Sequence, residues 1–150
     1  MKRKIQRATD MPADAYRFWH ERWCAILTKH HRQAIVDAGL AGLSFTERVP
    51  DAPDGKGYFS YAFAADGAVH FVEGEGGAVA EYDSYDLGLR MLSDAGFDAA
   101  QPIADGRFRI ISKPEHWRAL MTLLPILRNA CRTAIEATEE QFDLEVPKYW

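Results

Sequence analysis

The sequence contains little of what usually identifies a metal, cofactor or membrane protein. It has two cysteines, Cys24 and Cys131, and neither a Cys-x-x-Cys motif nor any other zinc spacing. The glycine-rich turn at residues 74–77 carries a glutamate and no lysine, so it does not fit a phosphate-binding loop. No apolar run reaches the ~18 residues that a bilayer-spanning helix needs, and none follows the basic start as in a secretory signal. We therefore expect a cytoplasmic protein with no metal, no cofactor and no membrane partner.

Charge, in contrast, is abundant and unevenly distributed along the chain. Residues 1–36 carry a net charge of +5, residues 37–105 a net charge of −10, and residues 106–150 a net charge of +1. Such a distribution predicts a negative field over one part of the surface, which attracts basic partners or cations and repels nucleic acid. The pattern therefore disfavours direct nucleic-acid binding.

The length and composition are those of one globular domain. A chain of 150 residues, 47% hydrophobic and 27% charged, can bury a core without disulfides or metal. We find no internal repeat and no long linker, so we predict a single domain over residues 1–150. Residues 1–9 carry four basic side chains and are interpreted as a basic tail, because chain ends are usually solvated.

Helical periodicity predicts two long amphipathic helices and one short helix. The first begins in the segment Asp10–Asp14, which combines capping acids with a proline, and runs to Ala38. The short helix covers residues 85–95. The last helix covers residues 113–141, begins at a Ser112–Glu115 capping box, and is expected to kink at Pro125.

Strand patterns lie between these helices, at residues 42–48, 58–65, 68–75, 78–82 and 106–111. Asp66-Gly67 is the preferred pair for a two-residue hairpin turn, which places Phe63 opposite His70 and Tyr61 opposite Val72. Neither face of this hairpin is purely polar, so both faces need cover from helices, a ligand or a second subunit, which leaves a homodimer open.

The order of these elements predicts an α+β fold. We expect an antiparallel sheet of about four to five strands, packed against two long amphipathic helices, with one short helix.

Few residues are spaced for catalysis. His20 and Cys24 lie one turn apart on the first helix and could form a metal-binding or thiolate–imidazole pair, but they border its apolar stripe, so packing is the favoured interpretation. His70 has no second catalytic group placed beside it by the sequence. We therefore expect a binding protein rather than an enzyme.

Our first functional hypothesis is a small acidic protein that occludes a basic protein partner, as inhibitor or immunity proteins do. Four carboxylates on adjacent strands around the glycine-rich turn would form the partner-binding edge: Glu73, Glu75, Glu81 and Asp83. Charge complementarity of this kind mainly accelerates association. The alternative interpretation is solvated charge that protects a sheet edge.

The second hypothesis is a small-molecule-binding domain or enzyme with an aromatic pocket between the sheet and the helices. The candidate pocket residues are Tyr58, Tyr61, Phe63, His70, Phe71 and Trp23. The same residues would also serve as an ordinary core, so this hypothesis ranks second.

Overall fold

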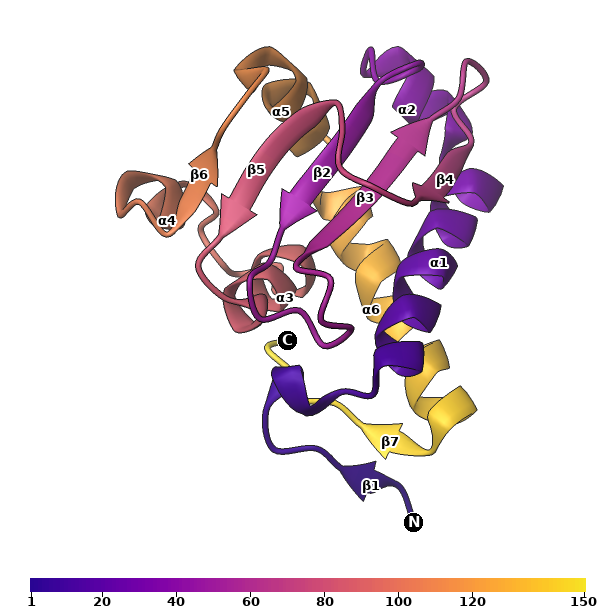
Figure 1. The fold of residues 1–150 in the computed structure, drawn as a ribbon. Coiled ribbons are helices and arrows are strands. Elements are labelled where there is room, and N and C mark those ends of the chain that lie inside the picture. The colour runs from indigo at the N-terminus through magenta and orange to yellow at the C-terminus, as the bar shows by residue number, and fades with distance from the viewer.

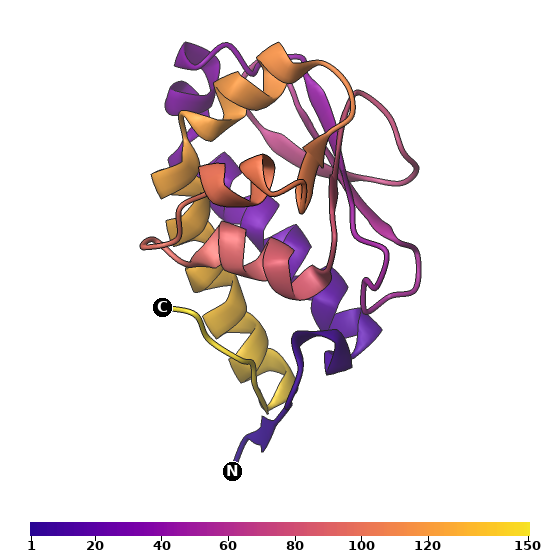
Figure 2. The ribbon, with the colours of Figure 1, turned by 90° about the vertical axis from the view of Figure 1, so that its left-hand side faces the viewer.

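A computed structural model describes all of residues 1–150 and confirms the α+β class. One layer is a five-stranded sheet with the order β4-β3-β2-β5-β6. Its strands are β2 (Ser44–Arg48), β3 (Tyr58–Phe63), β4 (Val69–Val72), β5 (Ala78–Tyr82) and β6 (Phe108–Ile110). The helices pack on one face of this sheet, and loops pass over the other face (Figures 1 and 2).

One pairing departs from the expected antiparallel sheet. β5 does not lie beside β4 but pairs in parallel with β2, so that Phe45 lies opposite Ala78 and Glu47 opposite Ala80. The connection from β4, residues 73–77, therefore crosses in front of β3 and β2 (Figure 1). This pairing leaves the half-exposed β4 at the edge and places the alanine-rich β5 in the interior, where burial stabilises it.

The hairpin between β3 and β4 has a different turn from the one expected. Ala64 N donates to Ala68 O at 2.8 Å, which closes a three-residue loop, and Phe63 lies opposite Val69 rather than His70. Gly67 has a φ of +88°, whereas Asp66 is not among the positive-φ residues. A three-residue hairpin loop with glycine in the left-handed position accounts for this geometry.

The one-residue shift reverses the faces of β4. His70 now lies opposite Ala62 and is exposed on the outer side, whereas Phe71 lies opposite Tyr61 on the side of the helices. The expectation that His70 shares a face with Tyr61 and Phe63 was wrong, because side chains alternate with a period of two and a slip of one residue moves each to the other face.

The helices are shorter and more numerous than expected. They are α1 (Ala13–His30), α2 (Arg32–Asp37), α3 (Tyr85–Ser93), α4 (Ala100–Ala104), α5 (Pro114–Met121) and α6 (Leu124–Phe142). The predicted first helix is broken at His31, and α4 falls in a segment that we expected to be a loop. Ser84 caps α3 by accepting a hydrogen bond from Leu87 N. None of these helices is both long and apolar enough to cross a lipid bilayer.

The expected kink at Pro125 is a complete break. α5 ends at Met121, and Pro125 occupies the first turn of α6, where its missing N–H leaves no intrahelical bond unmade. The Ser112–Glu115 capping box is absent, because Ser112 Oγ instead accepts a hydrogen bond from Val79 N of the sheet. Lys113, with a φ of +51°, precedes α5.

The N-terminal segment is not a free tail. A short strand, β1 (Arg3–Lys4), pairs in parallel with β7 (Leu144–Glu145), and a 3-10 helix, η1 (Ala8–Asp10), follows it. Ile5 is buried in the core, which gives this basic segment an apolar anchor that the charge count did not reveal.

The outer face of the sheet is covered by the chain itself at its centre. Thr46 Oγ1 donates to Gly76 O and accepts from Gly76 N, both at 2.8 Å, and it lies 2.9 Å from Ser60 Oγ. Both hydroxyl groups are buried under the 73–77 connection. A homodimer that covers this face remains a prediction.

Gly67→Val should destabilise the protein by more than ~1 kcal/mol, because it combines left-handed strain with steric overlap. A Cβ at position 67 would overlap the backbone carbonyl group of Arg32, at the start of α2. Gly74→Val is the matched control, since Gly74 has a φ of +84° but nothing within 4 Å of the added Cβ. Urea unfolding should show the larger loss for Gly67; equal losses would refute the contact with Arg32.

Candidate functional site

A buried carboxyl group occupies the middle of the central strand. Phe45 and Glu47 point from β2 toward the helices, whereas Thr46 points outward, as the alternation of a strand requires. Glu47 is only 3% exposed. An acidic residue at this position is costly unless hydrogen bonds or a cation compensate for its lost hydration.

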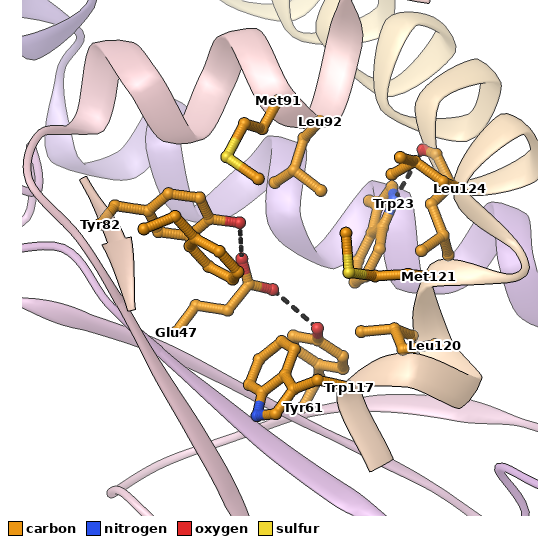
Figure 3. Close-up of a pocket in the computed structure, with 12 residues that line it drawn as sticks. Trp23, Glu47, Tyr61, Tyr82, Met91, Leu92, Trp117, Leu120, Met121 and Leu124 are labelled. Atoms are coloured by element: carbon orange, nitrogen blue, oxygen red, sulfur yellow. Dashed lines mark hydrogen bonds between the residues drawn. The ribbon is translucent and has the colours of Figure 1, made fainter. Parts of the chain in front are cut away.

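Two tyrosines supply the hydrogen bonds of this carboxyl group. Tyr61 Oη on β3 lies 2.7 Å from Glu47 Oε2, and Tyr82 Oη on β5 lies 2.6 Å from Glu47 Oε1 (Figure 3). Burial raises the pKa of both phenols well above the usual value, and the nearby carboxylate adds to the shift. Both hydroxyl groups therefore stay protonated and are able to donate.

Burial also raises the pKa of Glu47, although the hydrogen bonds from Tyr61 and Tyr82 oppose the shift. No lysine or arginine forms an ion pair with Glu47. The other buried carboxylate of the chain differs in this respect, because Glu139 pairs with Lys148 Nζ at 2.5 Å. Glu47 is thus a buried acid without a countercharge.

A small, partly open cavity of about 30 Å³ is lined by Glu47 and lies between the sheet and helices α1, α3, α5 and α6. Its lining residues are Trp23, Glu47, Tyr61, Tyr82, Met91, Leu92, Phe108, Trp117, Leu120, Met121, Leu124 and Leu127. Eleven of these twelve residues are hydrophobic, and Glu47 is the exception (Figure 3). The cavity thus sets one carboxyl group in an otherwise hydrophobic wall.

A second, smaller cavity of about 10 Å³ also has Glu47 in its lining. Its lining residues are Tyr16, Trp19, His20, Glu47, Val49, Phe59, Tyr82, Tyr85, Gly88, Leu89 and Leu92. Tyr16 Oη is buried there without a hydrogen-bond partner, whereas Trp19 Nε1 donates to Tyr85 Oη at 2.8 Å. Glu47 therefore belongs to the lining of both small cavities within one aromatic core.

His20 is part of this core and not of a metal site. Its ring stacks on Trp19 with centroids 3.7 Å apart, and its Nδ1 lies 2.8 Å from Tyr16 O. Burial lowers the pKa of His20 to about 3, so the ring is neutral at physiological pH. Burial likewise raises the pKa of Cys24 to about 12, which disfavours a reactive thiolate. The structure contains no group of three or more His, Cys, Asp or Glu side chains placed to hold a metal ion.

The structure separates the six residues of the expected aromatic pocket. Trp23 and Tyr61 line the cavity of about 30 Å³, whereas Phe63 is buried in the core and does not reach this cavity. Tyr58 lies on the outer face, where its hydroxyl accepts from Gly74 N. His70 and Phe71 border a separate groove between α1 and β4, with a volume of about 590 Å³ but wide open to solvent.

The four expected partner-binding carboxylates all form ion pairs within the chain. Glu73 pairs with Arg17 and Lys56, and Glu75 pairs with Arg48 at 2.7 Å. Arg109 bridges the other two, at 3.3 Å from Glu81 and 2.6 Å from Asp83. Arg17 and Arg109 from outside the middle segment, together with Arg48 and Lys56 from within it, thus balance the four carboxylates of this edge.

Glu47 is the residue that sequence reasoning missed. A signal was present, because Leu43, Phe45 and Glu47 share one side of the alternating strand, and an acid on an apolar side is unexpected. We counted Glu47 only toward the net charge. The tyrosines that bind it come from two other strands: Tyr61 depends on the β2–β3 pairing and Tyr82 on the β2–β5 pairing.

No protein-family model and no curated protein matches this sequence. The fold is nevertheless shared with solved structures. One is a conserved hypothetical protein from Thermus thermophilus, described with reservation as a sterol carrier protein, which has a TM-score of 0.51 and 16% identity over 87% of this chain and 89% of its own. Another is the crystal structure of sterol carrier protein 2, with a TM-score of 0.48 and 17% identity over 79% of this chain and 94% of its own.

Glu47→Gln should stabilise the protein relative to the parent, and this advantage should be larger at neutral pH than at acid pH. The folded protein holds the Glu47 proton more tightly than the unfolded chain, so the parent loses stability as pH rises above the unfolded pKa, near 4.5, toward the higher folded pKa. Glutamine has no proton to lose, so the advantage of the variant should grow between pH 4.5 and 8, by up to ~1.4 kcal/mol per unit of pKa shift. Urea unfolding at several pH values measures this, with Glu81→Gln on the outward side of β5 as control. A constant difference across the range would contradict a raised pKa.

His20→Gln should remove a loss of stability at low pH, which is opposite in sign to the pH effect of Glu47. The unfolded chain protonates this histidine near pH 6.5, but the folded protein does so only near pH 3, so the parent loses stability as pH falls through this window. The variant keeps a donor for Tyr16 O and lacks that loss. Thermal melts between pH 7 and 4 should show a steeper decline for the parent than for the variant. The exposed His70→Gln is the control, and parallel curves for the parent and His20→Gln would disprove the assignment.

Proposed function

We propose that the protein binds a small, mainly apolar molecule between its sheet and its helices, in an expanded form of the cavity beside Glu47. The observation that carries this proposal is the buried carboxyl group with its two tyrosines, set in an otherwise hydrophobic wall. A core that served packing alone would be more stable with an apolar residue at this position.

The cavity must enlarge to hold a ligand. Its volume of about 30 Å³ suits a water molecule or two, whereas ligand pockets usually enclose about 300 Å³ or more. The cavity therefore reaches the volume of a ligand pocket only if part of its wall moves outward.

Helix α5 is the part of the wall best placed to move. It contributes Trp117, Leu120 and Met121, and it lies between the left-handed Lys113 and the break before α6. Trp117 Nε1 is buried without a partner, so displacing its ring breaks no hydrogen bond of the indole. In contrast, Trp23 Nε1 on α1 donates to Leu127 O of α6 at 3.2 Å, which holds the opposite wall together.

The shared fold supports this class of function. The Thermus thermophilus protein of the same fold carries a description that names a lipid carrier, and its similarity covers 87% of the present chain. At 16% identity this similarity concerns the fold alone, so the binding proposal rests on the cavity and Glu47.

The acidic partner-binding hypothesis stays a prediction. Each of its four carboxylates has a cationic partner within the chain, so a basic protein would have to compete with existing ion pairs. No geometric feature of this edge favours a macromolecular partner over solvated charge.

Two variants with opposite effects test the binding proposal. Met121→Ala enlarges the cavity and should tighten binding of the apolar fluorophore Nile red, whereas Leu120→Trp fills the cavity and should weaken it ~10-fold or more. Fluorescence titration measures both affinities, and thermal melts verify that both variants fold. Ile103→Trp, at an exposed position on α4, is the control for the added indole. Failure of Nile red to bind any of these proteins, or equal affinities for all, would refute the site.

A further inference from the structure

Glu47 has unused capacity to accept hydrogen bonds. An ionised carboxylate offers about four lone-pair sites, and Tyr61 and Tyr82 occupy one on each oxygen. Glu47 lines the larger cavity with its carboxyl group held between Tyr61 and Tyr82 (Figure 3), so a ligand that enters this space can approach the remaining sites.

Aromatic rings surround this carboxyl group. Trp23 and Tyr61 meet edge to face with centroids 5.1 Å apart, Tyr82 and Phe108 lie 4.7 Å apart, and Trp117 adjoins Phe108 at 6.2 Å. All five rings line the larger cavity. Aromatic faces attract cations, and this attraction is strongest where water is excluded.

The chain offers no cation of its own to this carboxyl group. Arg128 on α6 is the buried arginine, but its guanidinium group is bound at the end of α3. There Nε donates to Met91 O at 2.9 Å and Nη2 donates to Phe97 O at 2.8 Å. Glu139, the other buried acid, is matched by Lys148. Only Glu47 combines burial, two neutral donors and the absence of a countercharge.

We infer that the preferred ligand of this site carries a protonated amine on an apolar body, and that Glu47 supplies its countercharge. The inference rests on the proposed function and names the ligand class for it. An ammonium group has enough N–H donors to fill both remaining acceptor sites, and it places its charge among the aromatic rings. A hydroxyl group donates only one hydrogen bond and brings no charge, and a carboxylate is repelled by the ionised form of Glu47.

The test compares three molecules that share one alkyl chain: octylamine, octan-1-ol and octanoate. Isothermal titration calorimetry at pH 7.5 should give the tightest binding for octylamine, ~10-fold or more above octan-1-ol, and the weakest for octanoate. Equal affinities for the amine and the alcohol, or tighter binding of either of the other two, would overturn the amine assignment while leaving the apolar site in place. No binding of any of the three would overturn both proposals.

Glu47→Gln separates the charge from the shape of the site. Glutamine has nearly the same volume and still offers polar atoms to Tyr61 and Tyr82, so the affinity for octan-1-ol, which brings no charge, should fall much less than the affinity for octylamine. The advantage of octylamine should disappear, because the countercharge is gone. Glu81→Gln, on the outward side of β5, should keep the preference of the parent. An amine preference that survives Glu47→Gln would place the recognition elsewhere and refute the role of Glu47.

Discussion

The placement of Glu47 on the central strand is the constraint on which the rest of the core depends. A buried carboxyl group needs hydrogen bonds, and both come from tyrosines on the two strands that flank β2. The register of β3 and the parallel pairing of β5 must therefore hold together for either tyrosine to reach it. The polar cluster thus favours one arrangement of three strands, whereas a purely apolar core would tolerate several.

The helices that cover the Glu47 cluster are not all joined to one another by hydrogen bonds. Helices α1 and α6 are joined by the hydrogen bond of Trp23, and α3 is tied to α6 by Arg128. The buried indole of Trp117 on α5 forms no such hydrogen bond, and the helical structure is interrupted between α5 and α6. A small cavity below the least restrained helix is consistent with a site that forms when the ligand arrives, at the cost of displacing that helix.

Charge along the chain and charge on the surface are different quantities in this protein. The middle segment carries −10 overall, yet the four carboxylates Glu73, Glu75, Glu81 and Asp83 lie against Arg17, Arg48, Lys56 and Arg109. Arg17 belongs to α1 and Arg109 to β6, so folding brings cations from both ends of the chain to the acidic edge. The electrostatic hypothesis drawn from the sequence therefore overestimates the negative field at this edge.

The sequence by itself determined the class of fold and most of the elements, because periodicity and capping are local properties. It indicated the strands of the five-stranded sheet, the start of the short helix near Ser84, a disturbance of the last helix at Pro125, and the aromatic layer that contains Trp23 and Tyr61. The sequence did not determine the register of the hairpin, because a turn with glycine fits a two-residue or a three-residue loop. Only the tertiary structure placed β5 beside β2 and assembled the site around Glu47, since strand pairing and the burial of a charge depend on residues far apart in the chain.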